Sequence, residues 1–364
     1  MNAKKRRLLY NAATYALVIL AFILCNIFYK DLSRTLRGML IPVCCWIVMA
    51  VSLNLVVGIS GELSLGHAGF MSIGAFTGIV FSGWLLNGFQ MENEPLRLML
   101  AMIAGGLLAG IFGFLIGIPV LRLRGDYLAI VTLAFGEIIR NVLNCVYVSA
   151  NGRGLAFGFI QPNLPGTLLL NGPNGAVSVG KISTFTAGFI LILITLAVVL
   201  NLINSRTGRA IMATRDNRIA AESVGINVTR HKMIAFVTAA VLAGAAGALF
   251  GLNYSTLVPG KFSFDQSINV LVFVVLGGIG NTLGAIISAT VLTVLPELLR
   301  EFSTYRMLIY AVLLILMMLL TNTPATRAFL NSLKAIGKRP AEKLLQGRKT
   351  VGSKDGSAKG GDRA

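Results

Sequence analysis

Charged side chains that could do chemistry inside a long apolar stretch are few in this sequence, and Glu137 and Arg140 are the clearest pair. They lie three residues apart, so on a helix they share one face and can form an ion pair. A charge surrounded by apolar residues is costly unless it is paired or has a function. The spacing therefore predicts an intramembrane ion pair, with a role in gating as the alternative. Asp126, earlier in the same stretch, is expected to cap the helix that begins at Tyr127.

Patterns of hydrolytic or metal chemistry are missing from the sequence. Residues 175–182 nearly spell a phosphate-binding P-loop, but Ile182 stands where the pattern needs Ser or Thr to hold Mg²⁺. His67 has no possible co-ligand nearby in the sequence, which favours a polar contact at a helix start over a metal site. The cysteines lie in apolar runs without metal spacing and are expected to be packing residues: Cys25, Cys44, Cys45 and Cys145. No enzymatic activity, metal or cofactor is therefore expected.

Two glycine-rich polar segments, Gly58–Phe70 and Leu276–Gly284, interrupt apolar runs at roughly corresponding places in the two halves of the chain. Such paired interruptions are typical of discontinuous helices around a translocation path. The residues expected to line this path or act as its hinges are Asn54, Gly61, Ser64, Gly66, His67, Gly69, Gly277, Gly278, Gly280 and Asn281.

The connector 205–232 is long and basic, and its sequence predicts a short helix over 218–224. Asp216 or Asn217 can cap this helix and Gly225 can end it. A rigid short helix on an internal loop could pass the motion of a soluble partner to the spans. The alternative is a long cytoplasmic connector without that role.

Within this connector, Ala220 and Ala221 are expected to give the short helix a smooth side that enters a groove on a partner protein. The residues expected at this coupling interface are Gly208, Arg209, Arg215, Asp216, Asn217, Ala220, Ala221, Glu222, Gly225 and Ile226.

The composition shows what kind of protein must hold these residues. The 364 residues are 55% apolar and 13% charged, with a mean hydropathy of +0.77, whereas a soluble domain carries roughly 25% charged residues. A soluble enzyme and a disordered chain are both excluded. The net charge of +18 is concentrated at the chain ends and in connectors, which disfavours nucleic-acid binding and indicates an all-α polytopic membrane protein within a lipid bilayer.

A bilayer core needs roughly 20 apolar residues per crossing helix. Runs that meet or approach this length are 8–29, 39–58, 67–89, 97–119, 127–148, 183–204, 233–256, 281–299 and 305–321. The run 267–278 covers only roughly 18 Å as a helix and is expected to be short or discontinuous. Counted as a crossing, it brings the prediction to about ten transmembrane helices.

Basic residues predict the orientation, because they favour the cytoplasmic side. Residues 1–7, the connector 205–232 and the tail 327–364 are all basic, so both termini are expected in the cytoplasm, on either side of a transmembrane domain over 8–326. The tail is expected to be disordered from about residue 338, where large apolar residues are scarce. It is either a solvated topogenic tail or a segment attracted to anionic lipid headgroups.

Several motifs together resemble one family. Eight segments are similar to those of ABC importer permeases for branched-chain amino acids: Leu53–Gly58, Gly61–Phe70, Gly125–Ile130, Thr207–Ala210, Ala220–Asn227, Lys232–Phe236, Ala243–Gly247 and Leu276–Gly284. They are spread over residues of about 40–320. The Gly-Asp-Tyr motif of 125–127 and the Ser-Leu-Gly-His-Ala motif of 64–68 resemble the M-type subunit more than its H-type partner.

The resemblance implies an inner-membrane permease that imports branched-chain or related amino acids. It also implies a second permease subunit, two cytoplasmic ABC ATPase subunits and a periplasmic substrate-binding protein as partners, with residues 216–226 docked on an ATPase. Two other functions stay open from the residues alone. One is a gradient-driven secondary carrier or channel for a small polar solute. The other is a membrane scaffold that does not transport.

Overall fold

The computed structural model describes residues 3–28, 33–123, 125–151, 154–159, 166–177 and 179–299, together with 305, 308–312 and 314–315. The chain forms two compact units, Met1–Leu298 and Leu299–Ala364. The described part of the second unit is helical over 308–312 and 314–315. The tail 327–364 and the first two residues of the basic N-terminus lie outside the described residues.

The first unit is mainly helical. Its longer helices are α1 (Ala3–Ile27), α2 (Arg34–Asn54), α3 (His67–Phe89), α4 (Glu94–Val120), α5 (Asp126–Cys145), α6 (Phe185–Asn204) and α9 (Val228–Gly251). The shorter helices are α7 (Arg206–Asp216), α8 (Arg218–Ser223), α10 (Phe264–Gly277) and α11 (Thr282–Leu298). The π-helix η2 (Leu55–Ile59) continues α2, and the 3-10 turns are η3 (Gly172–Asn174) and η4 (Pro259–Phe262).

Side-chain caps fix where several of these helices begin, because each cap satisfies a backbone N–H that has no partner within the helix. Ser33 accepts from the Leu36 amide at the start of α2, and Thr184 accepts from the Ala187 amide at the start of α6. Asn227 caps α9 through the Arg230 amide. This helix begins five residues before the apolar run at 233, so its first turn belongs to the polar connector.

The helices α3, α4 and α9 pack against one another and form one closely packed group of the bundle. Small residues allow this close packing: a Cβ added to Gly74 of α3 would overlap the backbone of Gly244 in α9, and one added to Gly105 of α4 would lie 2.8 Å from the Gly74 carbonyl oxygen. Such close backbone contact is how helices associate in an apolar solvent.

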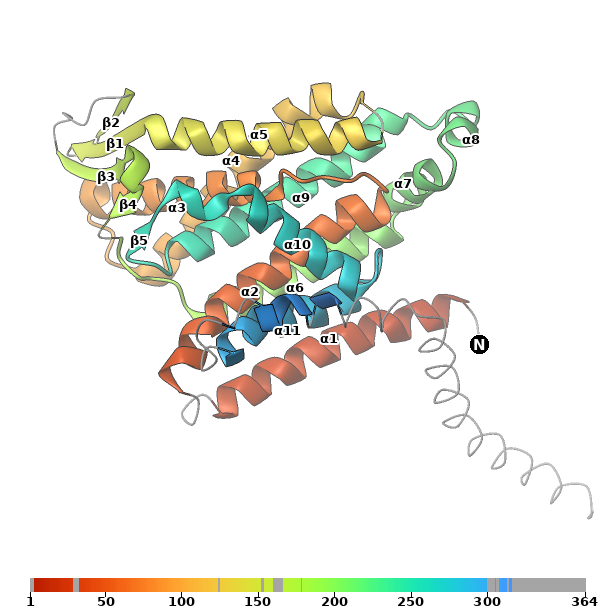
Figure 1. Cartoon of the computed structure of the whole chain (residues 1–364), viewed down its shortest axis with the longest axis horizontal. Helices are drawn as coiled ribbons and strands as arrows, with labels where there is room; N and C mark the ends of the chain where they lie inside the picture. Colours follow the sequence, from red (N-terminus) through yellow and green to blue (C-terminus); the bar gives the residue numbers. More distant parts are fainter. Residues whose placement is uncertain are drawn as a thin grey trace, which may run out of the picture. The chain divides into compact units, whose positions relative to one another are not determined.

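A second group of helices surrounds α2, which packs against α6, α9, α10 and α11. Figure 1 shows the resulting order across the first unit, from α4 and α5 through α3 and α9 to α2, α6 and α11, with α1 outermost. The helix α9 contacts both groups and therefore joins them.

Strands are the main departure from the expected all-α fold. β1 (Val146–Asn151) lies between antiparallel β2 (Gly154–Phe159) and β3 (Thr167–Asn171), and β4 (Ala176–Val177) pairs with β5 (Thr256–Leu257). The apolar run 127–148 was expected to be one helix, but α5 ends at Cys145 and Val146–Val148 begin β1. β-branched and aromatic side chains favour a strand there.

Six helices in the described residues are long and apolar enough to cross a membrane: Arg34–Ile59, His67–Phe89, Glu94–Val120, Asp126–Cys145, Phe185–Asn204 and Val228–Gly251. Three shorter apolar helices are Thr14–Ile27, Phe264–Gly277 and Thr282–Leu298. The run expected to be short, 267–278, corresponds to α10, which has 14 residues and ends at Gly277. Only part of the run 305–321 is described.

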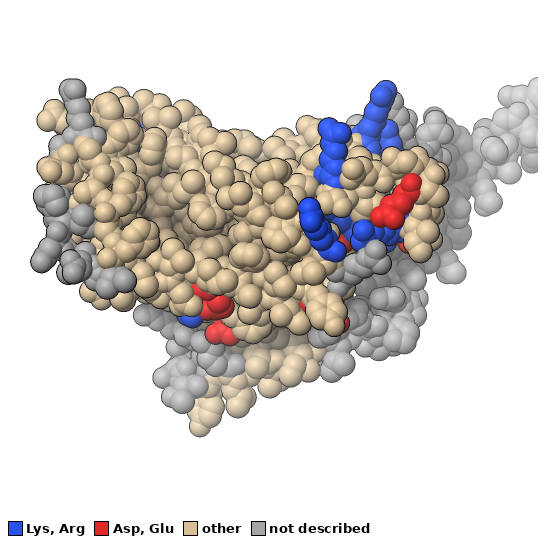
Figure 2. Space-filling model, turned by 90° about the horizontal axis from the view of Figure 1, so that it is seen from above, with Lys and Arg blue, Asp and Glu red and all other residues tan. Residues whose placement is uncertain are grey.

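The two ends of the first unit differ in chemistry. The strands gather at one end and α7 and α8 at the other (Figure 1). Figure 2 shows a face on which Lys and Arg are concentrated at the α7–α8 end, while most of the remaining described surface has no charged side chain. A wide uncharged surface with one basic end suits a protein that lies in lipid and presents that end to water.

Candidate functional site

The first glycine-rich segment begins where α2 loses its regular hydrogen bonding. The amide of Ser60 donates to the carbonyl oxygen of Leu55 at 3.1 Å, and the amide of Glu62 donates to Val56 at 3.1 Å. The first of these bonds is the π-turn of η2, and π-turns are frequent at functional sites. Gly61 then adopts a φ of 75°, which glycine tolerates best. The chain continues without regular structure until α3 starts at His67.

The second glycine-rich segment is a turn between two helices that pack against each other. α10 ends at Gly277 and α11 begins at Thr282, and the two helices are in contact. Gly278 and Gly280 have φ values of 91° and 83°. The Asn281 side-chain oxygen accepts from the Gly284 amide at 3.1 Å, at the start of α11. The segment thus reverses the chain between two separate helices, at the break that the sequence predicted between the runs 267–278 and 281–299.

The two segments meet although they are far apart in sequence. The Gly280 amide donates to Asn54 Oδ1 at 2.9 Å, across 226 residues. A Cβ added to Gly58 would overlap Asn54 Oδ1 and the Gly280 amide, and it would lie 2.7 Å from Gly280 Cα. The close approach of the two backbones therefore requires glycine at position 58.

Arg215, the next-to-last residue of α7, attaches the basic connector to this junction. Its Nη1 donates to the Gly58 carbonyl oxygen at 2.8 Å, and its Cγ would lie 2.5 Å from a Cβ added to Gly61. Nε and Nη2 also donate to Asp216 Oδ1 at 3.2 and 3.0 Å. One guanidinium thus satisfies a carbonyl at the end of α2 and holds a carboxylate of its own segment.

Glu62 and Lys232 form an ion pair beside Arg215, with side chains 12% and 10% exposed. Sequence reasoning missed this pair, although Lys232 stands out as a charge at the start of an apolar span. A cavity of about 440 Å³ opens next to it. Its polar lining includes Ser60, Glu62, Asp126, Thr214, Arg215, Arg218 and Lys232. The first segment, the start of α5 and the connector therefore share one polar cavity.

Three buried polar atoms in or just before the first segment have no hydrogen-bond partner among the described residues: Asn54 Nδ2, at the end of α2, and Ser60 Oγ and Ser64 Oγ. Buried polar groups are nearly always bonded, so a cluster of exceptions asks for an explanation. Three further atoms of this kind lie elsewhere in the described part of the chain: Arg97 Nε, Arg140 Nε and Thr293 Oγ1.

The other residues expected on the path hold the start of α3 in place. The ring Nε2 of His67 lies 2.8 Å from Ser52 Oγ of α2, as the polar-contact interpretation predicted. The Ala68 amide donates to Ser267 Oγ of α10 at 3.2 Å. A Cβ added to Gly66 would overlap the backbone of Thr132 in α5. These contacts, with Gly69 packed against Gly136 of α5, make this region a junction of four helices.

Glu137 joins α5 to α10. Its Oε2 lies 2.6 Å from Arg140 Nη2, and its Oε1 accepts from the amide of Phe264, the first residue of α10, at 3.2 Å. The carboxylate therefore pairs with its neighbour and also caps another helix. The expectation for Asp126 was wrong: α5 begins at Asp126, and the residue before it makes no side-chain cap.

The short helix α8 has the expected ends but not the expected exposed face. Asn217 Oδ1 accepts from the Ala220 amide at 3.0 Å, and Gly225, with a φ of 83°, follows the helix. Ala221 is only 3% exposed and packs inward, so the two alanines do not share an outward face. The exposed apolar side chains are Ile219, at 80%, and Val224, at 74%.

Most of the remaining connector residues form hydrogen bonds or ion pairs with nearby residues of the connector or of the end of α6. Ser205 Oγ accepts from the Gly208 amide at 3.0 Å, and Arg209 Nη1 donates to the Asn204 carbonyl at 3.1 Å. Both contacts tighten the corner between α6 and α7. On α8, Arg218 Nε lies 3.0 Å from Glu222 Oε1, and the Ile226 amide donates to the Ala221 carbonyl at 3.0 Å.

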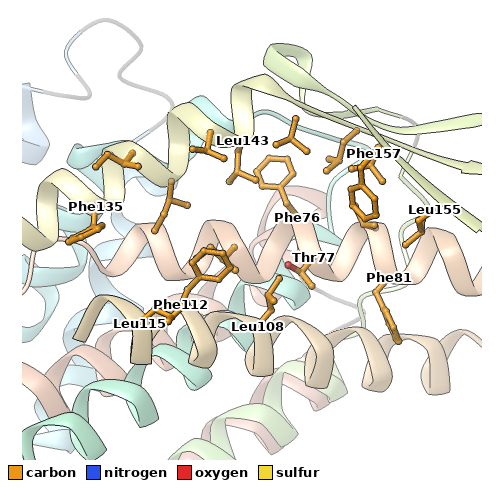
Figure 3. A pocket seen from close by; sticks show the side chains of 18 of the residues that line it. Phe76, Thr77, Phe81, Leu108, Phe112, Leu115, Phe135, Leu143, Leu155 and Phe157 are labelled. Carbon is orange, nitrogen blue, oxygen red and sulfur yellow. The ribbon is translucent and has the colours of Figure 1, made fainter. Parts of the chain in front are cut away.

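A larger cavity, of about 620 Å³, lies between α3, α4, α5 and the strands. Figure 3 shows its labelled side chains, which come from the helices and from β2 and are all apolar except Thr77. An amino acid has an ammonium and a carboxylate that need charged or hydrogen-bonding partners when they leave water. Apart from the Thr77 hydroxyl, no described residue that lines this cavity has a polar side chain, so it does not suit that class of ligand.

The comparisons with known proteins identify the family. Residues 35–321 match the family described as the permease component of branched-chain amino acid transport systems. LivM of Salmonella typhimurium, a high-affinity branched-chain amino acid transport permease, is 37% identical over 289 residues, which are 75% of this chain and 66% of the relative. This chain therefore spans just under two thirds of that relative's length.

More distant relatives have related functions. LivH of Salmonella typhimurium is 25% identical over 76% of this chain and 89% of its own length. The fructose import permease FruG of Bifidobacterium longum is 25% identical over 70% of this chain and 72% of its own. No solved structure matches the chain. The family match covers most of this helical chain, which belongs to the family of permease components of branched-chain amino acid transport systems.

Proposed function

We propose that this chain is a permease subunit of an ATP-driven importer for branched-chain or related amino acids. The observation that carries the proposal is the hydrogen bond from Arg215 to Gly58. It joins a basic connector, suited to a soluble partner, to the place where the apolar bundle is interrupted. The higher identity to LivM, at 37%, than to the fructose permease FruG, at 25%, supports the choice of ligand class.

In this proposal the chain crosses the inner membrane about ten times and both termini are cytoplasmic. A second permease subunit, two ABC ATPase subunits and a periplasmic binding protein complete the importer. ATP hydrolysis takes place in the ATPase subunits. The binding protein delivers the ligand to the end that carries the strands, and the ATPases act at the α7–α8 end.

The path runs beside the two glycine-rich segments. The residues proposed to line it or act as hinges are Asn54, Gly61, Ser64, Gly66, His67, Gly69, Gly277, Gly278, Gly280 and Asn281. Their glycines allow a backbone geometry that other residues resist, as the φ values of Gly61, Gly278 and Gly280 illustrate. Polar atoms of Asn54, Ser60 and Ser64 are buried without hydrogen-bond partners among the described residues. Because this is unfavourable, a conformation that pairs them would be favoured.

The coupling surface centres on α8. Ile219 and Val224 are the apolar side chains most exposed on the connector, and exposed apolar groups within a polar rim are typical of binding sites. Residues 205–232 carry six Lys or Arg residues against Asp216 and Glu222. The receiving groove on the ATPase is therefore expected to be apolar at its base and acidic at its rim.

A gradient-driven carrier is less well supported. Such carriers use carboxylates within their spans to bind ions or protons. Glu137, the best-placed candidate, is already engaged by Arg140 and by the Phe264 amide. It therefore acts as a structural link between α5 and α10.

The proposal is tested with proteoliposomes that contain this chain, its second permease and the ATPase pair, with binding protein outside. Uptake of labelled leucine that requires both internal ATP and binding protein is expected. Uptake by this chain alone, driven only by a leucine or ion gradient, would contradict the proposal.

Docking has its own test. Ile219→Asp places a charge in the apolar contact and is expected to reduce copurification of the ATPase by about tenfold or more. Ile219→Leu is the matched control and should retain wild-type copurification, because it keeps the apolar surface. Equal ATPase recovery with both variants would refute the assignment of α8 as the docking helix.

A further inference from the structure

We infer that Arg215, Gly58, Asn54 and Gly280 form a relay that passes movement of the connector to both glycine-rich segments. The inference rests on the proposed function, in which the connector receives movement from an ATPase. It makes Arg215 a positioning residue that acts inside the permease, whereas the sequence suggested a residue of the docking surface.

The first link of the relay is a capped helix end. The last carbonyls of a helix have no partner within it, and a charged donor satisfies them strongly. Arg215 Nη1 gives that hydrogen bond to the Gly58 carbonyl at 2.8 Å. The side chain also packs against Gly61, where an added Cβ would lie 2.5 Å from its Cγ. Since the arginine contacts the segment at two points, α7 cannot move without displacing it.

The second link joins the two segments. Asn54 stands one turn before Gly58 on the same side of the helix, and its Oδ1 accepts from the Gly280 amide at 2.9 Å. Gly58 and Gly280 also touch through their backbones. A displacement of Gly58 by Arg215 must therefore reach the turn between α10 and α11.

Buried polar atoms without hydrogen-bond partners support a second conformation of the relay. Asn54 Nδ2, Ser60 Oγ and Ser64 Oγ are buried without partners within the described structure. Each atom without a partner raises the free energy of this arrangement, and the relay includes a second arrangement in which these atoms are hydrogen-bonded. Nearby, the Glu62–Lys232 ion pair ties the same segment to α9.

The test uses the complete transporter in proteoliposomes and measures leucine uptake per ATP hydrolysed. Arg215→Gln removes the charged donor and is expected to lower this ratio by about tenfold, with ATPase copurification unchanged. Arg215→Lys, which keeps a charged donor, should recover part of the ratio. Arg206→Gln is the matched control, since Arg206 is exposed at the other end of α7 and its loss should leave the ratio unchanged.

A double variant separates a relay from two independent effects. Asn54→Ala alone should also lower the ratio, and Asn54→Ala with Arg215→Gln should fall no further than the more severe single change. Multiplied losses would overturn the relay. So would a wild-type ratio in Arg215→Gln, or a loss of ATPase binding in that variant. If the wild-type complex shows no ATP-dependent uptake, the proposed function itself fails; if wild type transports and Arg215→Gln equals it, only the relay fails.

Discussion

The contact between Gly58 and Gly280 leads to a prediction that can be worked out from the structure. Gly58→Ala adds a methyl group that overlaps Asn54 Oδ1 and the Gly280 amide. Overpacking of this kind costs about 1–3 kcal/mol, and loss of the Asn54–Gly280 hydrogen bond costs about 1 kcal/mol. Alanine returns about 1 kcal/mol of helix propensity. A net loss of about 1–3 kcal/mol in stability is expected.

The matched control is Gly38→Ala in α2, the helix that η2 continues, because nothing lies within 4 Å of a Cβ added to Gly38. The thermal midpoints of the two purified variants in one detergent are compared with that of the wild type. Gly38→Ala should keep or raise the midpoint, and Gly58→Ala should lower it. Gly58→Ala should also lower leucine uptake by the complete transporter. Midpoints and uptake that are equal in the two variants would refute the proposed contact between the segments.

Two further changes probe the charged residues. Glu62→Gln leaves Lys232 buried without its partner and is expected to destabilise the chain by about 3–5 kcal/mol. Glu222→Gln, in an exposed pair, should cost less than about 1 kcal/mol; equal thermal midpoints would contradict this difference. Glu137→Ala removes the ion pair and the cap on α10, whereas Glu137→Gln keeps an acceptor for the Phe264 amide. The alanine variant should therefore melt at the lower temperature, and the reverse order would show that Glu137 does not cap α10.

Local sequence patterns predicted much of the helical structure. Apolar runs near the length of a membrane crossing correspond to α2–α6 and α9, and Asn217 and Gly225 mark the ends of α8. The spacing of Glu137 and Arg140 predicted their contact, because residues three apart share a helix face. The motifs also pointed to the family that the comparisons then showed.

The junction itself could not be predicted from local patterns. Arg215 and Gly58 are 157 residues apart, and their contact depends on how α2 and α7 are placed by the whole bundle. The prediction that Ala220 and Ala221 share the exposed face of α8 was wrong, because a six-residue helix is too short for periodicity to show which side packs inward. The strands were missed because Val146–Val148 continue an apolar run, and short apolar runs do not distinguish helix from strand.

The location of α8 is the most direct test of this account. Val224→Cys in a chain whose native cysteines are replaced gives one exposed thiol, because Val224 is 74% exposed. A membrane-impermeant maleimide should label it in inside-out vesicles and not in intact cells, and bound ATPase should protect it. Labelling in intact cells would contradict a cytoplasmic coupling helix. So would labelling in inside-out vesicles that is equally strong with and without bound ATPase.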